Sequence, residues 1–417
     1  MKKFVLVFLV FVIAAGTFGF SGAGNTVYFS VTYHVDGVKK NIPVDDKSLT
    51  PSWWSFESKN NFTGGKTLYE RAKGLNIGKN PEALLRENFP ELYRIVTKIE
   101  KQTFHEKQDG IVNFDPDEMP KFWITGQEQG RELNTRKLCY DILKVLQTGK
   151  YAEICAEVKT IRPKSEKEVL SQITLRSQFS TNFEDNTPRE CNITLALESF
   201  DGLIVERNEI VSFNEIVGRR TRERGYQEAK IIIDGEFVPG VGGGVCQAST
   251  TLFNAVLLSG LKIVTSHNHS LPISYVPLGR DAMVSSVSDL KFQNNTGERI
   301  YIEAKVIDKG RTNTAQVKIY GKPSDVTYKP RVEVTYGALK TEVKGEVPLS
   351  MSGYNFITGE SWQYERKVLE KGYPPREAVT YLDTVKDGEV IRTKLIRKSN
   401  YKGKPQIIRY ERQASTL

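Results

Sequence analysis

A glycine-rich segment that runs directly into an apolar helix is the feature that most constrains this chain of 417 residues. It reads Gly-Val-Gly-Gly-Gly-Val-Cys-Gln-Ala-Ser-Thr-Thr over residues 240–251 and continues with Leu-Phe-Asn-Ala-Val-Leu-Leu. Glycine lets the backbone turn tightly and approach other atoms closely, and the apolar spacing after Cys246 is that of a buried helix. We therefore expect Cys246 at a helix start, where unpaired N–H groups and the helix dipole lower a thiol pKa and favour the nucleophilic thiolate.

Two histidines, His267 and His269, follow this cysteine in the chain. An acyl-transfer site needs a thiolate, an imidazole that takes and returns its proton, and a polar group that orients the imidazole. Cys246 supplies the first group, and either histidine supplies the second. Asp281 is the leading carboxylate for the third role, with Asp289 as the reserve.

Groups next to Cys246 complete the candidate site. Gly242, Gly243 and Gly244 come directly before the helix, and the backbone N–H groups of residues 245–248 are the candidate oxyanion hole. The candidate substrate-binding side chains carry amide, hydroxyl or guanidinium groups: Gln247, Ser249, Thr250, Arg219 and Arg220. Each feature also has an ordinary structural explanation, because hydroxyls cap helices, glycines allow close packing, and a cysteine can act as a small buried apolar residue.

Residues 1–24 have the pattern of an export signal. Lys2 and Lys3 precede an apolar stretch over 4–20, and Ser-Gly-Ala at 21–23 fits the small residues before a cleavage site. The apolar stretch also approaches the length of a membrane span, so the segment is either a cleaved signal peptide or a membrane anchor. Both alternatives predict an exported protein of the cell envelope, secreted or anchored on the outer face of the cytoplasmic membrane.

Composition limits the partners and cofactors. The chain has 59 Lys and Arg against 50 Asp and Glu, a formal net charge of +9, which favours anionic partners. For an exported protein these are peptidoglycan, another anionic wall polymer or lipid head groups, and no nucleic-acid-binding motif is present. Four cysteines are too few for a disulfide scaffold, and no CxxC or HExxH motif indicates a metal site. We expect no cofactor.

The N-terminal part of the chain predicts two α+β regions after the export signal. Residues 25–110 begin with an alternating strand that turns at Asp36-Gly37, and a helical pattern follows. Residues 111–170 form a smaller module, in which a helix begins after Asn134 as N-cap and ends at Gly149.

The remainder predicts a central and a C-terminal domain, so the fold class is α+β. The central domain, at 175–310, packs the Cys246 helix on a mainly antiparallel sheet and contains a hairpin at Asp234-Gly235. The C-terminal domain, at 325–412, is rich in β-strands.

Several motifs of the central domain resemble the VanW family. They are Ser-Phe-Asn at 212–214, Gly-Tyr at 225–226, the segment at 242–255, His-Ser at 269–270 and Tyr-Val-Pro-Leu-Gly-Arg-Asp-Ala at 275–282. Because His269 lies in one of these motifs, the resemblance favours it over His267 as the base. The family is named for a vancomycin-resistance cluster, so the resemblance implies a cell-wall setting and a link to glycopeptide-antibiotic resistance.

The flanking regions resemble modules of wall proteins. Gly-Arg-Glu-Leu-Asn at 130–134, with the helix and strand after it, resembles a peptidoglycan-binding module of exported bacterial wall proteins. Residues 368–410 resemble the C-terminal half of a G-five domain, with Gly372, Gly388 and Tyr401 at expected positions and Glu411 where that pattern has glycine.

The order Cys, His, Asp, with the cysteine opening a helix on a sheet, also resembles transglutaminase-like and NlpC-type cysteine enzymes. It does not match YkuD-type L,D-transpeptidases, in which the histidine precedes the cysteine. Two hypotheses follow. The first is Cys/His-dependent acyl transfer or amide hydrolysis on peptidoglycan peptides; the alternative is a non-catalytic protein that binds or organises peptidoglycan in the envelope.

Overall fold

The computed structural model describes residues 27–45, 64–78, 80–184, 187–233, 236–310, 312–355 and 360–415. The chain forms two compact units. The first contains the chain up to residue 112 together with 124–166, and the second contains 113–123 and the chain from 167 onward. The expected export signal at 1–24 and the turn at Asp234-Gly235 lie outside the described residues.

The first unit combines helices with short sheets. Its elements are β1 (Val27–Val35), β2 (Val38–Asp45), α2 (Gly64–Ala72), α3 (Pro81–Asn88), α4 (Pro90–Thr103), β5 (Gly130–Leu133), α5 (Thr135–Thr148), β6 (Glu153–Cys155) and β7 (Val158–Ile161). The strands β1 and β2 form the predicted hairpin, and Asp36 and Gly37 take φ values of 50° and 77° at its turn. Strands β3 (Ile111–Phe114) and β4 (Phe122–Thr125) pair with each other where the chain passes between the two units.

One hydrophobic core spans the first unit. One face of α4 is buried, and the same cluster includes Phe29 and Val31 of β1 and Leu138 and Ile142 of α5. Strand β6 also pairs in parallel with β1. The expected division into separate regions at residue 110 is therefore not seen, because elements from both sides of it share one core.

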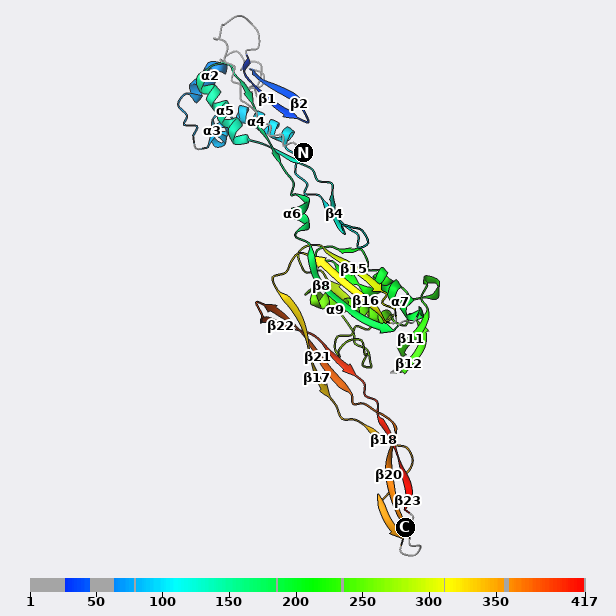
Figure 1. The fold of residues 1–417 in the computed structure, drawn as a ribbon. Coiled ribbons are helices and arrows are strands. Elements are labelled where there is room, and N and C mark those ends of the chain that lie inside the picture. Colours follow the sequence, from blue (N-terminus) through cyan, green and yellow to red (C-terminus); the bar gives the residue numbers. More distant parts are fainter. Residues whose placement is uncertain are drawn as a thin grey trace. The chain divides into compact units, whose positions relative to one another are not determined.

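The second unit is built on an antiparallel sheet with the strand order β8-β16-β15-β9. Its first elements are α6 (Glu166–Leu170), β8 (Thr174–Glu184), α7 (Thr187–Glu198), β9 (Leu203–Val205), β10 (Ile210–Ser212), α8 (Phe213–Val217), β11 (Glu228–Ile233), β12 (Glu236–Val241), α9 (Val245–Leu258), β13 (Lys262–Thr265), β14 (Lys291–Gln293), β15 (Ile300–Ile307) and β16 (Thr312–Gly321). Helix α9 packs against β8 and β16, and α7 packs against β15 and α9 (Figure 1). The cysteine-bearing helix thus lies on a mainly antiparallel sheet, as predicted.

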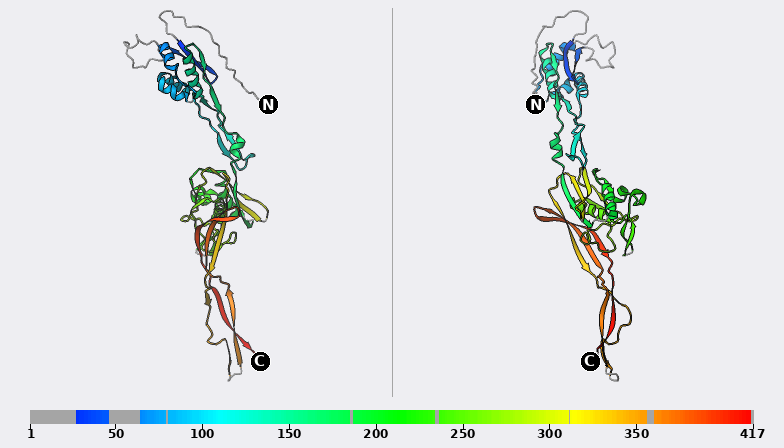
Figure 2. Two further views of the ribbon diagram at one scale, coloured as in Figure 1. Left: turned by 90° about the vertical axis from the view of Figure 1, so that its left-hand side faces the viewer. Right: turned by 45° about the vertical axis from the view of Figure 1, so that its right-hand side comes forward.

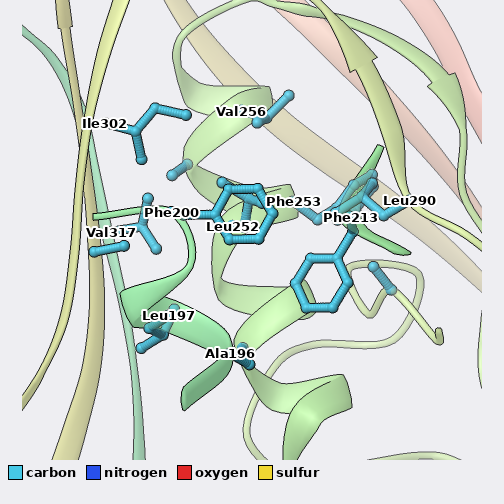
Figure 3. Close-up of a cluster of buried hydrophobic side chains, with 14 of the residues drawn as sticks. Ala196, Leu197, Phe200, Phe213, Leu252, Phe253, Val256, Leu290, Ile302 and Val317 are labelled. Atoms are coloured by element: carbon cyan, nitrogen blue, oxygen red, sulfur yellow. The ribbon is translucent and has the colours of Figure 1, made fainter. Parts of the chain in front are cut away.

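Helix α9 is the centre of this core. Every one of its residues except Cys246 and Leu258 is buried, so the helix is enclosed on nearly all sides. Leu252, Phe253 and Val256 pack among side chains from α7, α8, β14, β15 and β16 (Figure 3). The helix ends at Leu258, and Gly260 shortly after it takes a φ of 71°, which is typical of a glycine at a helix C-terminus.

The last part of the second unit consists of two further sheets, with the orders β17-β21-β22 and β18-β23-β20-β19. Their strands are β17 (Thr327–Tyr336), β18 (Thr341–Val343), β19 (Ser352–Asn355), β20 (Glu360–Glu370), β21 (Arg376–Lys386), β22 (Glu389–Tyr401) and β23 (Gln406–Ser415), coloured from yellow to red in Figure 2. Leu382 of β21 belongs to the core around α9. The first of these sheets is therefore packed on the central domain. Strand β16 lies entirely after the boundary expected at 310, yet it pairs with β8 and β15 inside the central sheet.

Candidate active site

The glycine-rich loop positions Cys246 in the first turn of α9. Gly242 and Gly244 have φ values of 87° and 111°, in the region that favours glycine. A Cβ on Gly243 would lie 2.6 Å from the carbonyl carbon of Ala229, so this glycine allows the loop to approach β11 closely. The sequence therefore folds as expected here, with Gly244 as N-cap and the cysteine as the second helical residue.

Gly244→Ala tests this loop. The positive φ should cost about 1–3 kcal/mol for any residue with a Cβ. The added Cβ would also lie 3.0 Å from Arg189 Cγ and 3.0 Å from Ile193 Cγ1. We expect a larger loss in the free energy of unfolding, measured in urea, than for the control Gly297→Ala. Gly297 has a φ of 87° but open space around it, so equal losses for the two variants would contradict the close packing.

His269 and Asp281 form a buried pair beside Cys246. Asp281 Oδ2 accepts hydrogen bonds from His269 Nδ1 at 2.7 Å and from the His269 backbone N–H at 2.6 Å. Their side chains are 6% and 1% exposed. The His269 ring is also hydrogen-bonded to the Cys246 thiol, whose Sγ lies 3.3 Å from the Val284 carbonyl oxygen. The three residues favoured from the sequence are thus brought together.

The reserve residues lie elsewhere. His267 is exposed, and its backbone pairs with Met283. Asp289 accepts hydrogen bonds from the Ser212 hydroxyl at 2.6 Å and from the Asn214 N–H at 3.0 Å, so it holds the start of α8. Neither side chain lines the cavity beside Cys246, although the charge of Asp289 acts on Arg220, which does.

The environment shifts the pKa values of all three residues. Burial opposes ionisation of the Cys246 thiol, but the hydrogen bond and charge of His269 outweigh it, so the pKa of Cys246 is lowered. Burial also opposes protonation of His269, yet its hydrogen bonds to Asp281 and Cys246 raise its pKa to about 9. The Asp281 pKa is lowered in spite of burial, because His269, Tyr401 and Arg397 stabilise the carboxylate. These shifts favour a thiolate beside an imidazolium.

The site opens into a cavity of about 820 Å³. Cys246 and His269 line it, together with the candidate residues Arg219, Arg220 and Gln247. Further lining residues include Arg189, Asn214, Lys230, Tyr275, Gly242 and Gly244. Cys246 is half-buried as a residue and borders this cavity, whose size suits a small bound substrate.

Comparison with known proteins places this site within one family domain. Residues 188–320 match the family model described as VanW like protein. The central part of this chain is a VanW-like domain. Cys246, His269 and Asp281 all lie inside the matched residues.

Two relatives match this chain in part. The uncharacterized protein YoaR of Bacillus subtilis (strain 168) is 46% identical over 149 residues, which are 35% of this chain and 49% of that protein. The vancomycin B-type resistance protein VanW of Enterococcus faecalis (strain ATCC 700802 / V583) is 29% identical over 124 residues, 28% of this chain and 44% of that protein. The chain therefore spans about half or less of the length of these curated relatives.

A comparison with solved structures finds the crystal structure of HP0197-G5. It is 21% identical and covers 21% of this chain and 97% of that chain, with a TM-score of 0.14. A TM-score this low establishes no shared fold, so the G-five resemblance of the C-terminal strands stays a prediction.

Two residues outside the VanW-like domain complete the surroundings of Asp281. Tyr401, at the end of β22, donates its hydroxyl to Asp281 Oδ1 at 2.6 Å and accepts the Gly279 N–H at 2.7 Å. Arg397 Nη2, on the same strand, donates to the backbone oxygen of Asp281 at 2.6 Å and lies 3.4 Å from Asp281 Oδ1. A strand of the C-terminal part thus holds the carboxylate that orients His269.

Tyr401→Phe isolates this contact. Loss of the hydroxyl leaves the buried Asp281 Oδ1 without its shortest hydrogen bond and the Gly279 N–H without its acceptor. We expect a loss of about 1–3 kcal/mol in the free energy of unfolding, measured by urea denaturation. The control is Tyr381→Phe on the neighbouring strand β21, which should change stability far less. A Tyr401→Phe variant as stable as the control would show that the hydroxyl does not hold Asp281.

Two candidate hydroxyls in the VanW-like domain anchor the loop that carries Asp281. Ser249 Oγ donates to the Ala282 carbonyl oxygen at 2.6 Å, and Thr250 Oγ1 accepts the Ala282 N–H at 2.9 Å. Both side chains are fully buried, and neither lines the cavity. The structure therefore assigns these two hydroxyls to the scaffold of the site and not to substrate contact.

Gln247 lines the cavity, but its amide is used inside the protein. It accepts a hydrogen bond from Arg189 at 2.7 Å and donates to Thr181 and to the Asn182 carbonyl oxygen at 3.0 Å each. The predicted substrate contact from this amide would require these bonds to rearrange.

Sequence reasoning missed some members of the site. Tyr275 lines the cavity and hydrogen-bonds Thr250, and burial raises the pKa of its hydroxyl, which therefore stays protonated. Its signal was present, because Tyr275 begins one of the motifs that resemble the VanW family. Arg189 lies on α7, and no local pattern in the sequence points to it. Among the described residues no group of three His, Cys, Asp or Glu side chains is placed to hold a metal ion.

Proposed function

We propose that this chain is an exported cell-envelope protein whose VanW-like domain uses Cys246, His269 and Asp281 for acyl transfer or amide hydrolysis on peptidoglycan peptides. The observation that carries the proposal is the buried His269–Asp281 pair in hydrogen-bonding contact with a helix-start cysteine at the wall of a large cavity.

The geometry supports a thiolate mechanism. The Cys246 thiolate attacks the substrate carbonyl carbon, a C–S bond forms, and the carbonyl π electrons move to the oxygen. The tetrahedral species then collapses, the C–N bond breaks, and the leaving amine takes the proton of His269 Nε2, which leaves a thioester. Water or the amine of a second peptide gives a proton to His269 and attacks the thioester, which restores the thiolate.

The helix start offers the developing oxyanion a hydrogen-bond donor. The N–H groups of Val245 and Gln247 donate to the carbonyl oxygens of Gly242 and Gly244 at 3.1 Å and 2.7 Å. Cys246 lies between these two residues in the chain. Because the N–H groups of both neighbours already have acceptors, we assign the oxyanion contact to the Cys246 N–H. A transglutaminase-like or NlpC-like arrangement would fit this placement of a cysteine helix on an antiparallel sheet.

The proposed setting rests on several features together. One relative is a vancomycin resistance protein by name, which supports a cell-envelope role and a link to glycopeptide-antibiotic resistance. The sequence pattern of residues 1–24, the net charge of +9 and the resemblances of the flanking regions favour export and a peptidoglycan or other anionic wall partner. Within the described residues, no helix has the length and apolar character of a membrane span.

The test uses the full chain and purified peptidoglycan sacculi, with mass spectrometry of the released and cross-linked peptides. We expect wild-type protein and the control Cys191→Ala to change the stem peptides or cross-links, and Cys246→Ala to leave them unchanged. Cys191 is half-buried on α7 and does not line the cavity, so its removal tests for a general effect of losing a thiol. If Cys246→Ala binds sacculi and has the same effect as wild type, the protein is a wall-binding scaffold and the catalytic proposal is wrong.

A further inference from the structure

The cavity beside Cys246 has a one-sided charge. Its lining includes Arg219, Arg220, Lys230 and Arg189, and no Asp or Glu side chain is among the described residues that line it. Arg219 and Arg220 lie on one segment of the chain, and Lys230 lies on β11. Both segments are distant in sequence from His269 and Asp281. The positive charge is therefore a property of the cavity and not of one loop.

Arg220 is the central member of this set. Its guanidinium is half-buried, lies 5.7 Å from the Phe213 ring centroid and donates to Asn214 Oδ1 at 2.6 Å. Asn214 is neutral, so this contact orients the guanidinium without cancelling its charge. A planar guanidinium held in this way matches the two oxygens of a carboxylate.

Part of the remaining wall is apolar. Ile231, Ile232, Ile273, Met283 and Val284 line the cavity beside the cations. A ligand that fits both sets of groups carries an anionic group and short aliphatic side chains. These cations would attract an anionic ligand and repel a basic peptide.

We propose that the acyl donor of this site carries a free carboxylate near the bond that is broken, and that Arg220 binds it with help from Arg219 and Lys230. This inference rests on the proposed function and names the substrate class for it: an anionic peptide with small apolar residues. The carboxylate contact would hold the carbonyl carbon against the Cys246 sulfur, so the cations select substrates and position them.

Two alkylating reagents of similar size test the inference in the full-length protein. Iodoacetate carries a carboxylate and iodoacetamide is neutral, and both form the same C–S bond with a thiolate while iodide leaves. The rate of each reaction is measured at Cys246 and at the exposed Cys155 by mass spectrometry of the digested protein. We expect the iodoacetate-to-iodoacetamide ratio to be about tenfold or more higher at Cys246 than at Cys155, and to fall as salt is added.

Charge-removing variants locate the effect. Arg219→Gln combined with Lys230→Gln removes two exposed cations of the cavity and should lower the ratio at Cys246 several-fold without loss of folding. Arg207→Gln removes an exposed arginine that does not line the cavity and should leave the ratio unchanged. An equal ratio at Cys246 and Cys155, or no effect of the double variant, would overturn the inference.

The outcome also separates this inference from the proposed function. If Cys246 reacts rapidly with iodoacetamide but shows no preference for iodoacetate, the nucleophile stands and the carboxylate site is wrong. If Cys246 reacts no faster than Cys155 with either reagent, the proposed nucleophile itself is contradicted, and the carboxylate site with it.

Discussion

Asp281→Asn is expected to lower the free energy of unfolding of the second unit by about 3–5 kcal/mol, because it removes one charge from a buried group of charges. The carboxylate accepts hydrogen bonds from His269 and Tyr401, and the Arg397 guanidinium beside it is only 9% exposed. An amide of the same shape leaves this guanidinium without its counter-charge and leaves the imidazolium with only the Cys246 thiolate. Urea denaturation of the full chain, followed by a probe of the second unit, measures the loss.

The control for this variant is Asp289→Asn. Asp289 also accepts two short hydrogen bonds, but it lies at the start of α8 and 16% of its side chain is exposed. Its replacement should cost only about 1 kcal/mol, the usual value for a helix-capping contact. Equal losses for the two variants would mean that Asp281 is an ordinary polar residue and not the anchor of a buried charged group.

The difference between wild type and Asp281→Asn should also depend on pH. The His269 pKa is raised to about 9, so the stabilisation from its protonated form is complete below the unfolded value of 6.5 and is lost as the pH rises through about 9. We expect the two proteins to approach each other in stability above this pH. A difference that stays constant across this range would show that His269 is not protonated in the folded protein.

His269→Gln is expected to have the largest effect on reactivity. Without the imidazolium, burial is the main influence on the Cys246 thiol, and burial raises a thiol pKa. Buried Cys139 shows this effect, since burial raises its pKa to about 12. Each unit of increase removes about tenfold of the thiolate at neutral pH, so the rate of reaction with iodoacetamide should fall at least about tenfold.

The matched control is His267→Gln. His267 is exposed and does not line the cavity, so its replacement should leave the Cys246 rate unchanged. The rate at Cys155, in the other unit, gives the reactivity of an exposed thiol in the same sample for comparison. A Cys246 rate that survives His269→Gln, or falls equally with His267→Gln, would contradict the assignment of His269 as the base.

Local patterns predicted the elements that carry the nucleophile. The glycines before Cys246 and the apolar spacing after it are features of residues close together in the chain, and they predicted α9 and its start correctly. The same holds for β1 and its turn, for α4 and for the Asn134-capped α5, whose cap accepts the Lys137 N–H at 3.3 Å. In each case a local backbone preference and a buried face agree.

Contacts between distant segments could not be predicted in this way. Tyr401 and Arg397 reach Asp281 from 120 and 116 residues along the chain, and no periodic pattern encodes such a pairing. Strand β16 was not predicted as part of the central domain, because its residues come after the boundary expected at 310. In the structure it pairs with β8 and β15 inside the central sheet. The segment at 209–218, rich in strand formers, is divided into β10 and α8, because Ser212 caps a helix by accepting the Glu215 N–H at 3.1 Å.

The pH dependence of alkylation at Cys246 in the wild-type protein tests the thiolate–imidazolium pair most directly. Iodoacetamide reacts with both Cys246 and Cys155, and mass spectrometry gives the two rates from about pH 5 to 10. The pair predicts that the Cys246 rate reaches half of its maximum below the ordinary thiol pKa of about 8.5, and at a lower pH than the Cys155 rate. A Cys246 rate that rises together with that of Cys155, or only at higher pH, would contradict the assignment of Cys246 as an activated nucleophile.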